Sequence, residues 1–322
     1  MSREPSAHAP QGVVARVDFG GCVVLLDDDR VLEATVRGRV MGPRKALGNA
    51  VVVGDRVALE HAGDAVAISG VEPRRNTFSR RAPGKKPVEQ VVAANLDQVV
   101  CVASFADPEF SPGLVDRVLC QAEHLGLPAR LAVNKHDLLA EDAAAGQAIL
   151  DAYALAGYPV HPVSAHTGEG LEALRRALLG RRSLFVGHSG VGKSRLLHAL
   201  EPRYDLLSGQ VNPKTGKGRH TTTAAWLLRP EAGFELIDTP GVRAFGLWAI
   251  GPRDLDQSYA EFRRFLGACR FADCAHDREP GCALREAVAR GEISDRRLAS
   301  YHKLRDELAQ EQELERLRGA GW

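Results

Sequence analysis

Eight residues in the middle of the chain fit the phosphate-loop pattern G-x-x-x-x-G-K-[ST]. They are Gly187, His188, Ser189, Gly190, Val191, Gly192, Lys193 and Ser194. Glycines in such a loop let consecutive backbone N–H groups turn toward phosphate oxygens, at a helix N-terminus that already favours negative charge. The lysine of this pattern reaches the β- and γ-phosphates, and the hydroxyl that follows it binds Mg²⁺. The pattern therefore predicts a site for a magnesium-bound nucleoside triphosphate.

The residues around this loop have the pattern that the motif requires. The apolar run SLFV before it predicts a buried strand, and LLHAL after it predicts a helix. A chance match in a glycine-rich chain is the alternative, and residue frequencies give roughly one such match per hundred or two sequences. The strand–loop–helix context favours a true phosphate loop.

A second set of residues could read the nucleotide base. The apolar run RLAV is followed by Asn134, Lys135, His136 and Asp137. A carboxylate at a strand end can accept two hydrogen bonds from guanine, through N1–H and the exocyclic amine, and adenine lacks that pair of donors. Further along, Ser164 and Ala165 follow another strand, where the Ala165 N–H could meet the guanine O6. Together the two segments predict a guanine pocket.

Two later segments could bind magnesium and sense the γ-phosphate. Asp238-Thr239-Pro240-Gly241 follows the strand FELI, so Asp238 would hold the Mg²⁺ shell and the Gly241 N–H would meet the γ-phosphate. Thr222 or its neighbour Thr221 is a candidate second magnesium ligand. A plain structural turn would be the favoured interpretation of Asp-Thr-Pro-Gly if it stood alone.

The motifs occur in a rotated order. Both base-reading segments precede the phosphate loop, and Asp238-Thr239-Pro240-Gly241 comes last, whereas Ras-like GTPases begin with the phosphate loop. A rotated order can still build the same sheet, because domain termini often lie close enough for circular permutation. The chain is therefore predicted to contain a circularly permuted GTPase domain.

The residue after Gly241 matters for hydrolysis. It is Val242, where Ras-like enzymes carry a glutamine that orients the attacking water. Because valine cannot orient water, another residue or a partner must do so. His220, beside the candidate magnesium threonines, is the predicted water-positioning residue. A structural or RNA-contacting role for this histidine is the alternative.

Four residues near the C-terminus have the types and spacing of a zinc site. They follow the pattern C-x4-C-x-H-x5-C and are Cys269, Cys274, His276 and Cys282. Three thiolates and one imidazole complete a tetrahedron, so the predicted Zn²⁺ is structural and has no open position. Scattered reduced thiols are the alternative. The other three cysteines, Cys22, Cys101 and Cys120, are in apolar runs and are predicted to be core residues.

The elements that position these residues follow from the pattern of apolar runs. From about residue 95, apolar runs alternate with helix-like stretches near 112–126, 142–157, 169–180 and 193–200. This alternation predicts a parallel α/β sheet with ligands at the carboxyl ends of its strands. An amphipathic helix is predicted at 294–318, with Leu298, Tyr301, Leu304 and Leu308 on its apolar face.

The N-terminal third has a different pattern. Short strands between residues 11 and 72 suggest an OB-type barrel, whose open face commonly binds oligonucleotides, or alternatively an SH3-like barrel. Residues 73–90 have no regular period and are predicted to be a linker. This stretch carries six cations, with Phe78 among them as a stacking face for RNA; they are Arg74, Arg75, Arg80, Arg81, Lys85 and Lys86. A solvated linker is the alternative.

Composition excludes few partners. The 322 residues contain 42 Lys and Arg and 41 Asp and Glu, a net charge of +1, so nucleic acid would need a local basic patch. We expect no secretory signal and no membrane-spanning segment, and hence a cytoplasmic protein. Nothing in the sequence suggests an obligate dimer, and a monomer is expected.

Taken together, the rotated motif order, the GRHTTT segment at 218–223 and the cysteine spacing resemble the RsgA (YjeQ) family of circularly permuted GTPases. The resemblance implies three modules: an RNA-binding OB-fold at 11–72, the permuted GTPase domain at 91–248, and a zinc-binding module with a C-terminal helix at 249–322. The basic linker at 73–90 separates the first two, and residues 1–10 are expected to be disordered. It also points to His220 in catalysis.

The same resemblance implies a function. The expected activity is hydrolysis of GTP to GDP and phosphate, stimulated by the small ribosomal subunit, in late assembly of that subunit and in contact with its rRNA. Two alternatives remain: an RNA-binding assembly factor that uses GTP only as a switch, and a permuted GTPase acting on another ribosomal particle.

Overall fold

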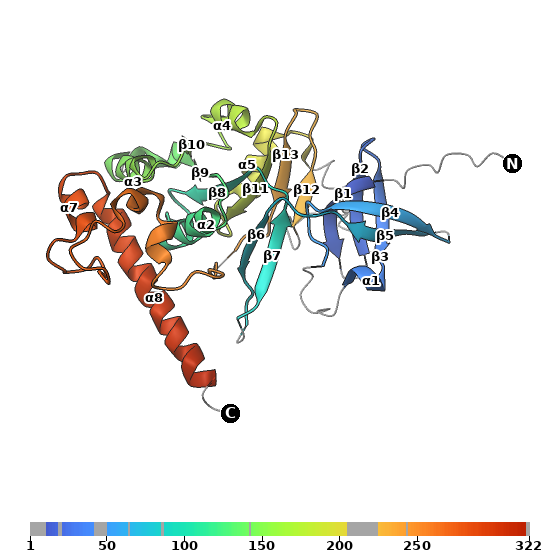
Figure 1. The fold of residues 1–322 in the computed structure, drawn as a ribbon. Helices are drawn as coiled ribbons and strands as arrows, with labels where there is room; N and C mark the ends of the chain where they lie inside the picture. Colours follow the sequence, from blue (N-terminus) through green and yellow to red (C-terminus); the bar gives the residue numbers. More distant parts are fainter. Residues whose placement is uncertain are drawn as a thin grey trace.

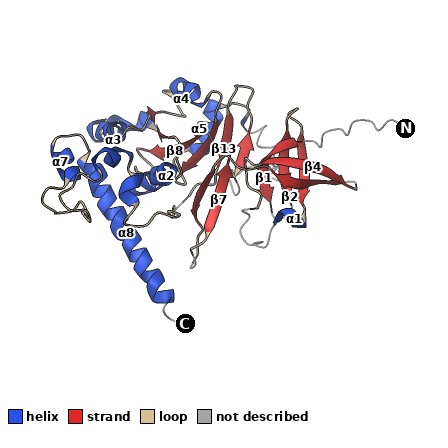
Figure 2. Ribbon diagram, in the orientation of Figure 1, coloured by secondary structure: helices blue, strands red, loops and turns tan. Residues whose placement is uncertain are grey.

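The computed structural model describes residues 11–18, 21–41, 50–63, 65–84, 87–141, 143–204, 225–242 and 244–319. The predicted disordered segment 1–10 lies outside these residues, as do Lys85, Lys86, His220, Thr221 and Thr222. Along the described chain a β-barrel is followed by a sheet with helices packed against it, and then by a helical C-terminal module (Figures 1 and 2). The architecture is therefore the mixed α/β arrangement that the sequence predicts.

The N-terminal part is a closed five-stranded barrel with the strand order β1-β2-β3-β5-β4. Its elements are β1 (Gln11–Asp18), β2 (Gly21–Leu26), β3 (Val31–Val36), α1 (Gly38–Met41), β4 (Arg56–Ala62) and β5 (Ala65–Val71). Strands β3 and β5 pair parallel, and the other neighbours pair antiparallel. Alternate side chains such as Val14, Val24 and Leu59 fill the interior. The predicted OB-type barrel is confirmed.

The central part is a six-stranded sheet with the order β10-β9-β8-β11-β13-β12. Its strands are β8 (Gln98–Ser104), β9 (Ala129–Asn134), β10 (Val160–Pro162), β11 (Arg182–Gly187), β12 (Trp226–Leu228) and β13 (Glu235–Asp238). All neighbours are parallel except β12, which runs antiparallel to β13. The helices that follow the strands are α2 (Pro112–His124), η1 (His136–Glu141), α3 (Ala143–Leu155), α4 (Leu171–Leu178) and α5 (Lys193–Leu200). Every residue of β8 is buried, as expected for a strand covered on both faces.

The segment predicted to be an irregular linker is partly regular, and here the prediction was wrong. Strands β6 (Thr77–Arg81) and β7 (Glu89–Ala94) pair antiparallel as a two-stranded sheet. Phe78 is wholly buried, and its ring centroid lies 5.8 Å from that of Phe245. Phe78 therefore anchors the hairpin to the segment after Gly241, and it is not the RNA-stacking face that was expected.

The C-terminal module consists of short helices and one long helix. Its elements are η2 (Leu255–Ser258), η3 (Ala260–Phe265), α7 (Ala283–Ala289) and α8 (Asp295–Gly319), and α8 extends away from the body toward the C-terminus (Figure 1). The four predicted apolar-face residues of α8 are all buried, as are Cys22, Cys101 and Cys120. Both of these predictions are confirmed. Within the described residues, no helix has the length and apolar character needed to cross a membrane.

A buried ion cluster joins this module to the sheet. Arg297 of α8 is only 2% exposed and contacts Asp116 of α2, while its Nε lies 2.7 Å from Glu261 Oε1 of η3. The guanidinium also lies over the Tyr259 ring, 4.4 Å from the centroid. Because removing one partner of a buried ion pair is costly, this cluster fixes how α8 sits on α2.

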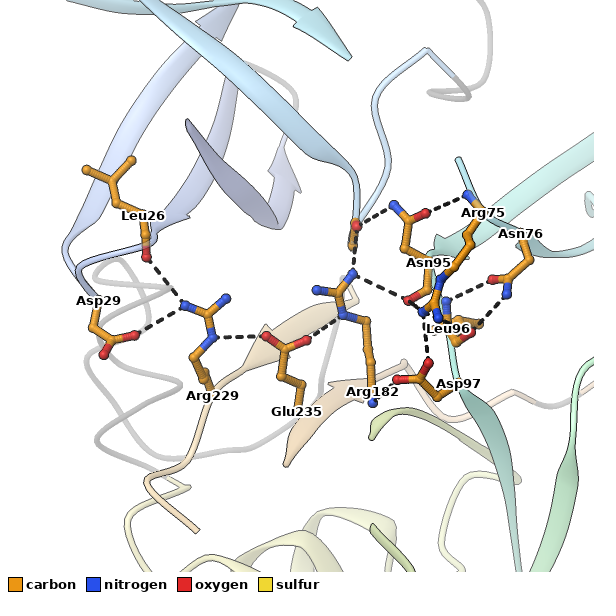
Figure 3. A network of polar contacts seen from close by, with 11 residues as sticks. Leu26, Asp29, Arg75, Asn76, Asn95, Leu96, Asp97, Arg182, Arg229 and Glu235 are labelled. Atoms are coloured by element: carbon orange, nitrogen blue, oxygen red, sulfur yellow. Dashed lines mark hydrogen bonds and ion pairs between the residues drawn. The ribbon is translucent and has the colours of Figure 1, made fainter. Parts of the chain in front are cut away.

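The barrel and the sheet are joined by a chain of ion pairs and hydrogen bonds (Figure 3). Arg229, directly after β12, lies 3.2 Å from Asp29 of the barrel and 2.9 Å from Glu235 of β13. Glu235 also pairs with Arg182 of β11, whose Nη1 donates to the Gly54 carbonyl at 2.9 Å. Burial raises the pKa of Glu235, but Arg182 and Arg229 outweigh burial, and the net effect lowers it. The contact between the barrel and the sheet is thus held by Glu235, a partly buried carboxylate that stays ionised.

Candidate nucleotide site and metal centre

A cavity of about 750 Å³ lies where the predicted base-reading and phosphate-binding segments meet. Eleven predicted residues line it: Asn134, Lys135, Asp137, Ala165, His188, Ser189, Gly190, Gly192, Lys193, Ser194 and Gly241. The other residues predicted for the nucleotide site, within the described chain, lie in the same segments without lining the cavity. They are His136, Ser164, Gly187, Val191 and Asp238. Four lining residues were not predicted: Asp107, Leu138, His166 and Arg195. Segments separated by about a hundred positions in the sequence therefore face one space.

The phosphate loop connects the end of β11 to the start of α5. Strand β11 ends at Gly187 and α5 begins at Lys193. Gly192 has a φ of +83°, and a Cβ there would lie 2.6 Å from Asn134 Nδ2. Only glycine tolerates both this backbone conformation and this close approach. The loop thus presses against the base-reading segment.

Asn134 holds the three parts of the site together. Its buried side chain donates from Nδ2 to the Val191 carbonyl at 3.0 Å, and its Oδ1 accepts the Ala165 N–H at 3.0 Å. A single amide therefore links the phosphate loop with both base-reading segments. Because these bonds engage both ends of the amide, Asn134 acts as a clamp between the phosphate loop and the second base-reading segment.

The carboxylate expected to read guanine is also positioned by a neighbour. A hydrogen bond from Ser164 lowers the pKa of Asp137, so this carboxyl is held as an acceptor. Ser164 Oγ in turn accepts the backbone N–H groups of His166 and Thr167 at 3.2 and 3.0 Å. An ionised acceptor at this place is what the N1–H and amine of guanine require.

Two further contacts involve the base-reading residues His136 and Lys135. The His136 Nδ1 lies 2.9 Å from Glu169 Oε1, which joins the two base-reading segments at the surface. Lys135 donates from Nζ to the Asp107 carbonyl, in the loop after β8. This loop has no recognisable nucleotide-binding pattern in the sequence, and only the parallel pairing of β8 with β9 brings Asp107 to the cavity.

On the phosphate side, Lys193 and Asp238 are in direct contact. Lys193 donates from Nζ to Asp238 Oδ1 and to the Thr239 carbonyl. Asp238 is fully buried at the end of β13, and its Oδ2 accepts a hydrogen bond of 2.6 Å from the Tyr204 hydroxyl. The predicted phosphate-binding amine and the predicted magnesium-side carboxylate thus form one buried cluster.

Asp-Thr-Pro-Gly packs directly on the phosphate loop. A Cβ on Gly241 would lie 2.9 Å from Ser189 Cα, so a larger residue would displace one segment from the other. The Val242 N–H donates to the Gly187 carbonyl at 3.0 Å. Val242 therefore extends the contact with the loop as a backbone partner, and its apolar side chain offers no group to orient water.

The four predicted zinc ligands converge, although they span loops and the start of α7. Their ligand atoms all lie within 4.8 Å of one another, and His276 Nδ1 is 3.5 Å from the sulfurs of both Cys269 and Cys282. Three sulfurs and a nitrogen at this separation suit tetrahedral Zn²⁺. The cluster is therefore compatible with a zinc centre.

A carboxylate supports the histidine of this cluster. Asp256 Oδ2 lies 3.7 Å from His276 Nε2, and the His302 Nε2 lies 2.9 Å from the His276 carbonyl. Carboxylates commonly orient the imidazoles that bind zinc. Asp256 comes twenty positions before His276, and sequence spacing alone could not identify it.

The arginines predicted as a basic patch for RNA have intramolecular partners. Arg74 pairs with buried Asp55 at 2.7 Å, and Arg75 pairs with Asp97 at 2.8 Å. The Arg80 guanidinium donates to the Gln90 side chain at 3.1 Å, and burial lowers the pKa of Arg80. Arg81 pairs with Glu311 and Glu315 of α8. Each of these four arginines therefore has a partner within the chain, and Arg75 is exposed while the other three are half-buried.

The sheet order, the cavity and the rotated motifs define the class of this protein: it is a circularly permuted GTPase. Residues 71–248 match the RsgA GTPase family, and the chain belongs to that family.

Its relatives extend over nearly the whole chain. A protein of Gemmatimonas aurantiaca named "Small ribosomal subunit biogenesis GTPase RsgA" is 46% identical over 303 residues, covering 92% of this chain and 97% of the relative. A protein of the same name from Shewanella oneidensis is 40% identical over 282 residues, covering 86% and 78%.

Two solved structures resemble the fold. YjeQ from Thermotoga maritima has a TM-score of 0.72 at 31% identity and covers 93% of this chain and 98% of its own. YloQ, described as a circularly permuted GTPase, has a TM-score of 0.70 at 26% identity and covers 96% and 98%.

Proposed function

We propose that this GTPase acts in late assembly of the small ribosomal subunit and that this subunit stimulates its hydrolysis of GTP. The observation that carries the GTP-binding part of this proposal is the Asn134 clamp, which joins both base-reading segments and the phosphate loop around one cavity. The names of the relatives point to the small subunit.

In this proposal the cavity binds GTP with its base toward Asp137 and its phosphates toward Lys193. Asp137 and the Ala165 N–H read guanine, and the backbone of residues 187–194 holds the phosphates with Lys193. Ser194 and Asp238 would hold Mg²⁺, with Thr222 or Thr221 as a further ligand. When bound, Mg²⁺ neutralises charge on the β- and γ-phosphates. The oxygen donors present suit this ion.

Hydrolysis needs a group that orients water, and Val242 cannot be that group. We assign this role to His220 or to a group supplied by the subunit. A GTPase that lacks such a group hydrolyses slowly alone, and a partner that supplies one raises the rate strongly. Dependence on a partner is therefore part of the proposed mechanism.

The two flanking modules would provide the binding surface for rRNA, and Zn²⁺ would hold the C-terminal one. Cys269, Cys274, His276 and Cys282 would bind a single structural zinc ion, which orders the loops before α7. Because Arg74 and its neighbours have internal partners, we assign rRNA contact to the barrel face and the C-terminal module rather than to that stretch. We further propose a cytoplasmic monomer.

Cosedimentation with separated ribosomal subunits tests this proposal. The protein, loaded with a non-hydrolysable GTP analogue or with GDP, is mixed with purified small or large subunits at moderate salt. We expect it to sediment with small subunits in the analogue-bound state. Binding to large subunits alone would instead support a GTPase of another particle. Binding to small subunits, with no rise in turnover when the same mixture is assayed with GTP itself, would support a switch-only assembly factor.

A further inference from the structure

We propose that Tyr204 is a positioning residue for GTP hydrolysis, which holds the Asp238 carboxylate in the orientation that magnesium requires. This inference rests on the proposed nucleotide site, because it assigns Asp238 to the magnesium shell. Tyr204 lies outside every nucleotide-binding pattern in the sequence, and it does not line the cavity.

The geometry carries the first step of the argument. The Tyr204 hydroxyl donates to Asp238 Oδ2 at 2.6 Å, the short distance expected of a charge-assisted O–H···O⁻ bond. Tyr204 is 3% exposed and Asp238 is fully buried. A buried carboxylate must have its oxygens satisfied, and such a hydrogen bond is strong in the absence of water.

The other carboxylate oxygen of Asp238 contacts the phosphate-loop lysine. Oδ1 accepts from Lys193, the lysine that the phosphate-loop pattern directs to the β- and γ-phosphates. If phosphates draw Lys193 away, Oδ1 exchanges this contact for one in the magnesium shell. Tyr204 keeps its hold on Oδ2, so the carboxylate retains its orientation through the exchange.

Tyr204 lies just beyond the end of α5. Its ring lies against His198 of α5, with centroids 6.0 Å apart, and its N–H donates to the Glu201 carbonyl at 2.9 Å. These contacts fix Tyr204 to the helix that begins with Lys193 and Ser194. The same helix therefore supplies the phosphate-binding amine at its start and the support for Asp238 just beyond its end.

The test compares Tyr204→Phe with a matched control. Tyr153→Phe removes the same group from a similar setting, since the Tyr153 hydroxyl donates to buried Asp116 at 2.8 Å, away from the nucleotide cavity. The readout is the dissociation rate of fluorescent mant-GDP over a range of Mg²⁺ concentrations, with thermal unfolding measured alongside.

The magnesium midpoint is the Mg²⁺ concentration that gives half of the full slowing of mant-GDP dissociation. We expect Tyr204→Phe to raise this midpoint by about tenfold, within the range for loss of a hydrogen bond to a charged group. Affinity for mant-GDP in EDTA should stay near that of the wild type. High Mg²⁺ should restore kcat for GTP at a temperature where the unfolding curves show both proteins to be fully folded without Mg²⁺, so that a gain in stability cannot account for the recovery. Tyr153→Phe should lower the unfolding temperature and leave the magnesium midpoint unchanged.

An unchanged magnesium midpoint in folded Tyr204→Phe would overturn the proposal. Tyr204→Met, whose flexible side chain fills the space differently, takes its place if the first variant does not fold. In an Asp238→Asn background, Tyr204→Phe should cause no further shift, because its effect passes through that carboxylate. If the wild type itself bound mant-GDP without any dependence on Mg²⁺, the proposed site would fail as well, and this outcome is distinguishable.

Discussion

Asn134→Ala should uncouple the nucleotide site while leaving the sheet intact. The substitution removes two well-formed hydrogen bonds of 3.0 Å, to the Val191 carbonyl and from the Ala165 N–H. A third contact, to the Gly192 carbonyl, is at the limiting distance of 3.5 Å and adds little. At about 1 kcal/mol net for each good bond, the loss is about 2 kcal/mol. If the whole of this free energy is lost from the nucleotide-bound state relative to the free protein, GDP affinity falls roughly thirtyfold.

Gln98→Ala is the matched control for this prediction. Gln98 is also a fully buried amide in the same sheet, with hydrogen bonds to Ser183 Oγ at 2.8 Å, to the Ala177 carbonyl at 3.0 Å and from Arg130 Nε at 2.8 Å. It begins β8, whereas the cavity lies at the opposite ends of the strands.

Isothermal titration with GDP, together with thermal unfolding, provides the measurement. Both variants should unfold at lower temperature than the wild type, and only Asn134→Ala should lose nucleotide affinity. Equal GDP affinity in the two variants would refute the role of Asn134 as a clamp.

The remaining predictions concern the guanine-reading carboxylate, the zinc site, and the contact between the barrel and the sheet. Asp137→Asn replaces an acceptor with a donor toward guanine, so GTP binding should fall about a hundredfold by titration while thermal stability changes little; retained GTP affinity would argue against this residue as the base reader. Asp256→Asn should weaken zinc retention against a chelator by about tenfold, since it supports His276, and unchanged retention would show that it does not. The lowered pKa of Glu235, usually 4.5, means that its pairing with Arg182 stabilises the fold above that pH and is lost as the pH falls further. Unfolding followed from pH 6 to pH 3 should show a smaller stability loss in Glu235→Gln than in the wild type.

The parts of the site that were predictable are those set by contiguous residues. A phosphate loop, a base-reading tetrad and Asp238-Thr239-Pro240-Gly241 each follow an apolar run. Strand ends in a parallel sheet converge at one edge, so the order of the motifs did not prevent the prediction. The same local reasoning predicted the barrel strands and the apolar face of α8.

The parts that were missed depend on pairings between distant segments. Asp107 reaches the cavity only because β8 lies beside β9, and Tyr204 reaches Asp238 across 34 positions. The basic stretch looked free because its acidic partners are far away, as with Arg81 and Glu315 on α8. Charge in a sequence therefore indicates how many cations are present, but their partners appear only in the fold.

The hairpin β6–β7 was missed for a similar reason. Prolines at 73, 83 and 87 interrupt the pattern and suggest an irregular chain, yet they lie outside the paired residues 77–81 and 89–94. What stabilises the hairpin is Phe78 packed against Phe245, a contact that spans most of the GTPase domain.

GTP turnover in the presence of purified small ribosomal subunits tests the central claim most directly. The rate is measured at saturating GTP and Mg²⁺ while the small subunit is titrated, with the large subunit as the control. The account predicts slow turnover alone and a saturable rise of at least about a hundredfold with the small subunit, on the scale by which a partner-supplied group completes a GTPase site. A rate unchanged by the small subunit, or raised equally by the large one, would contradict it.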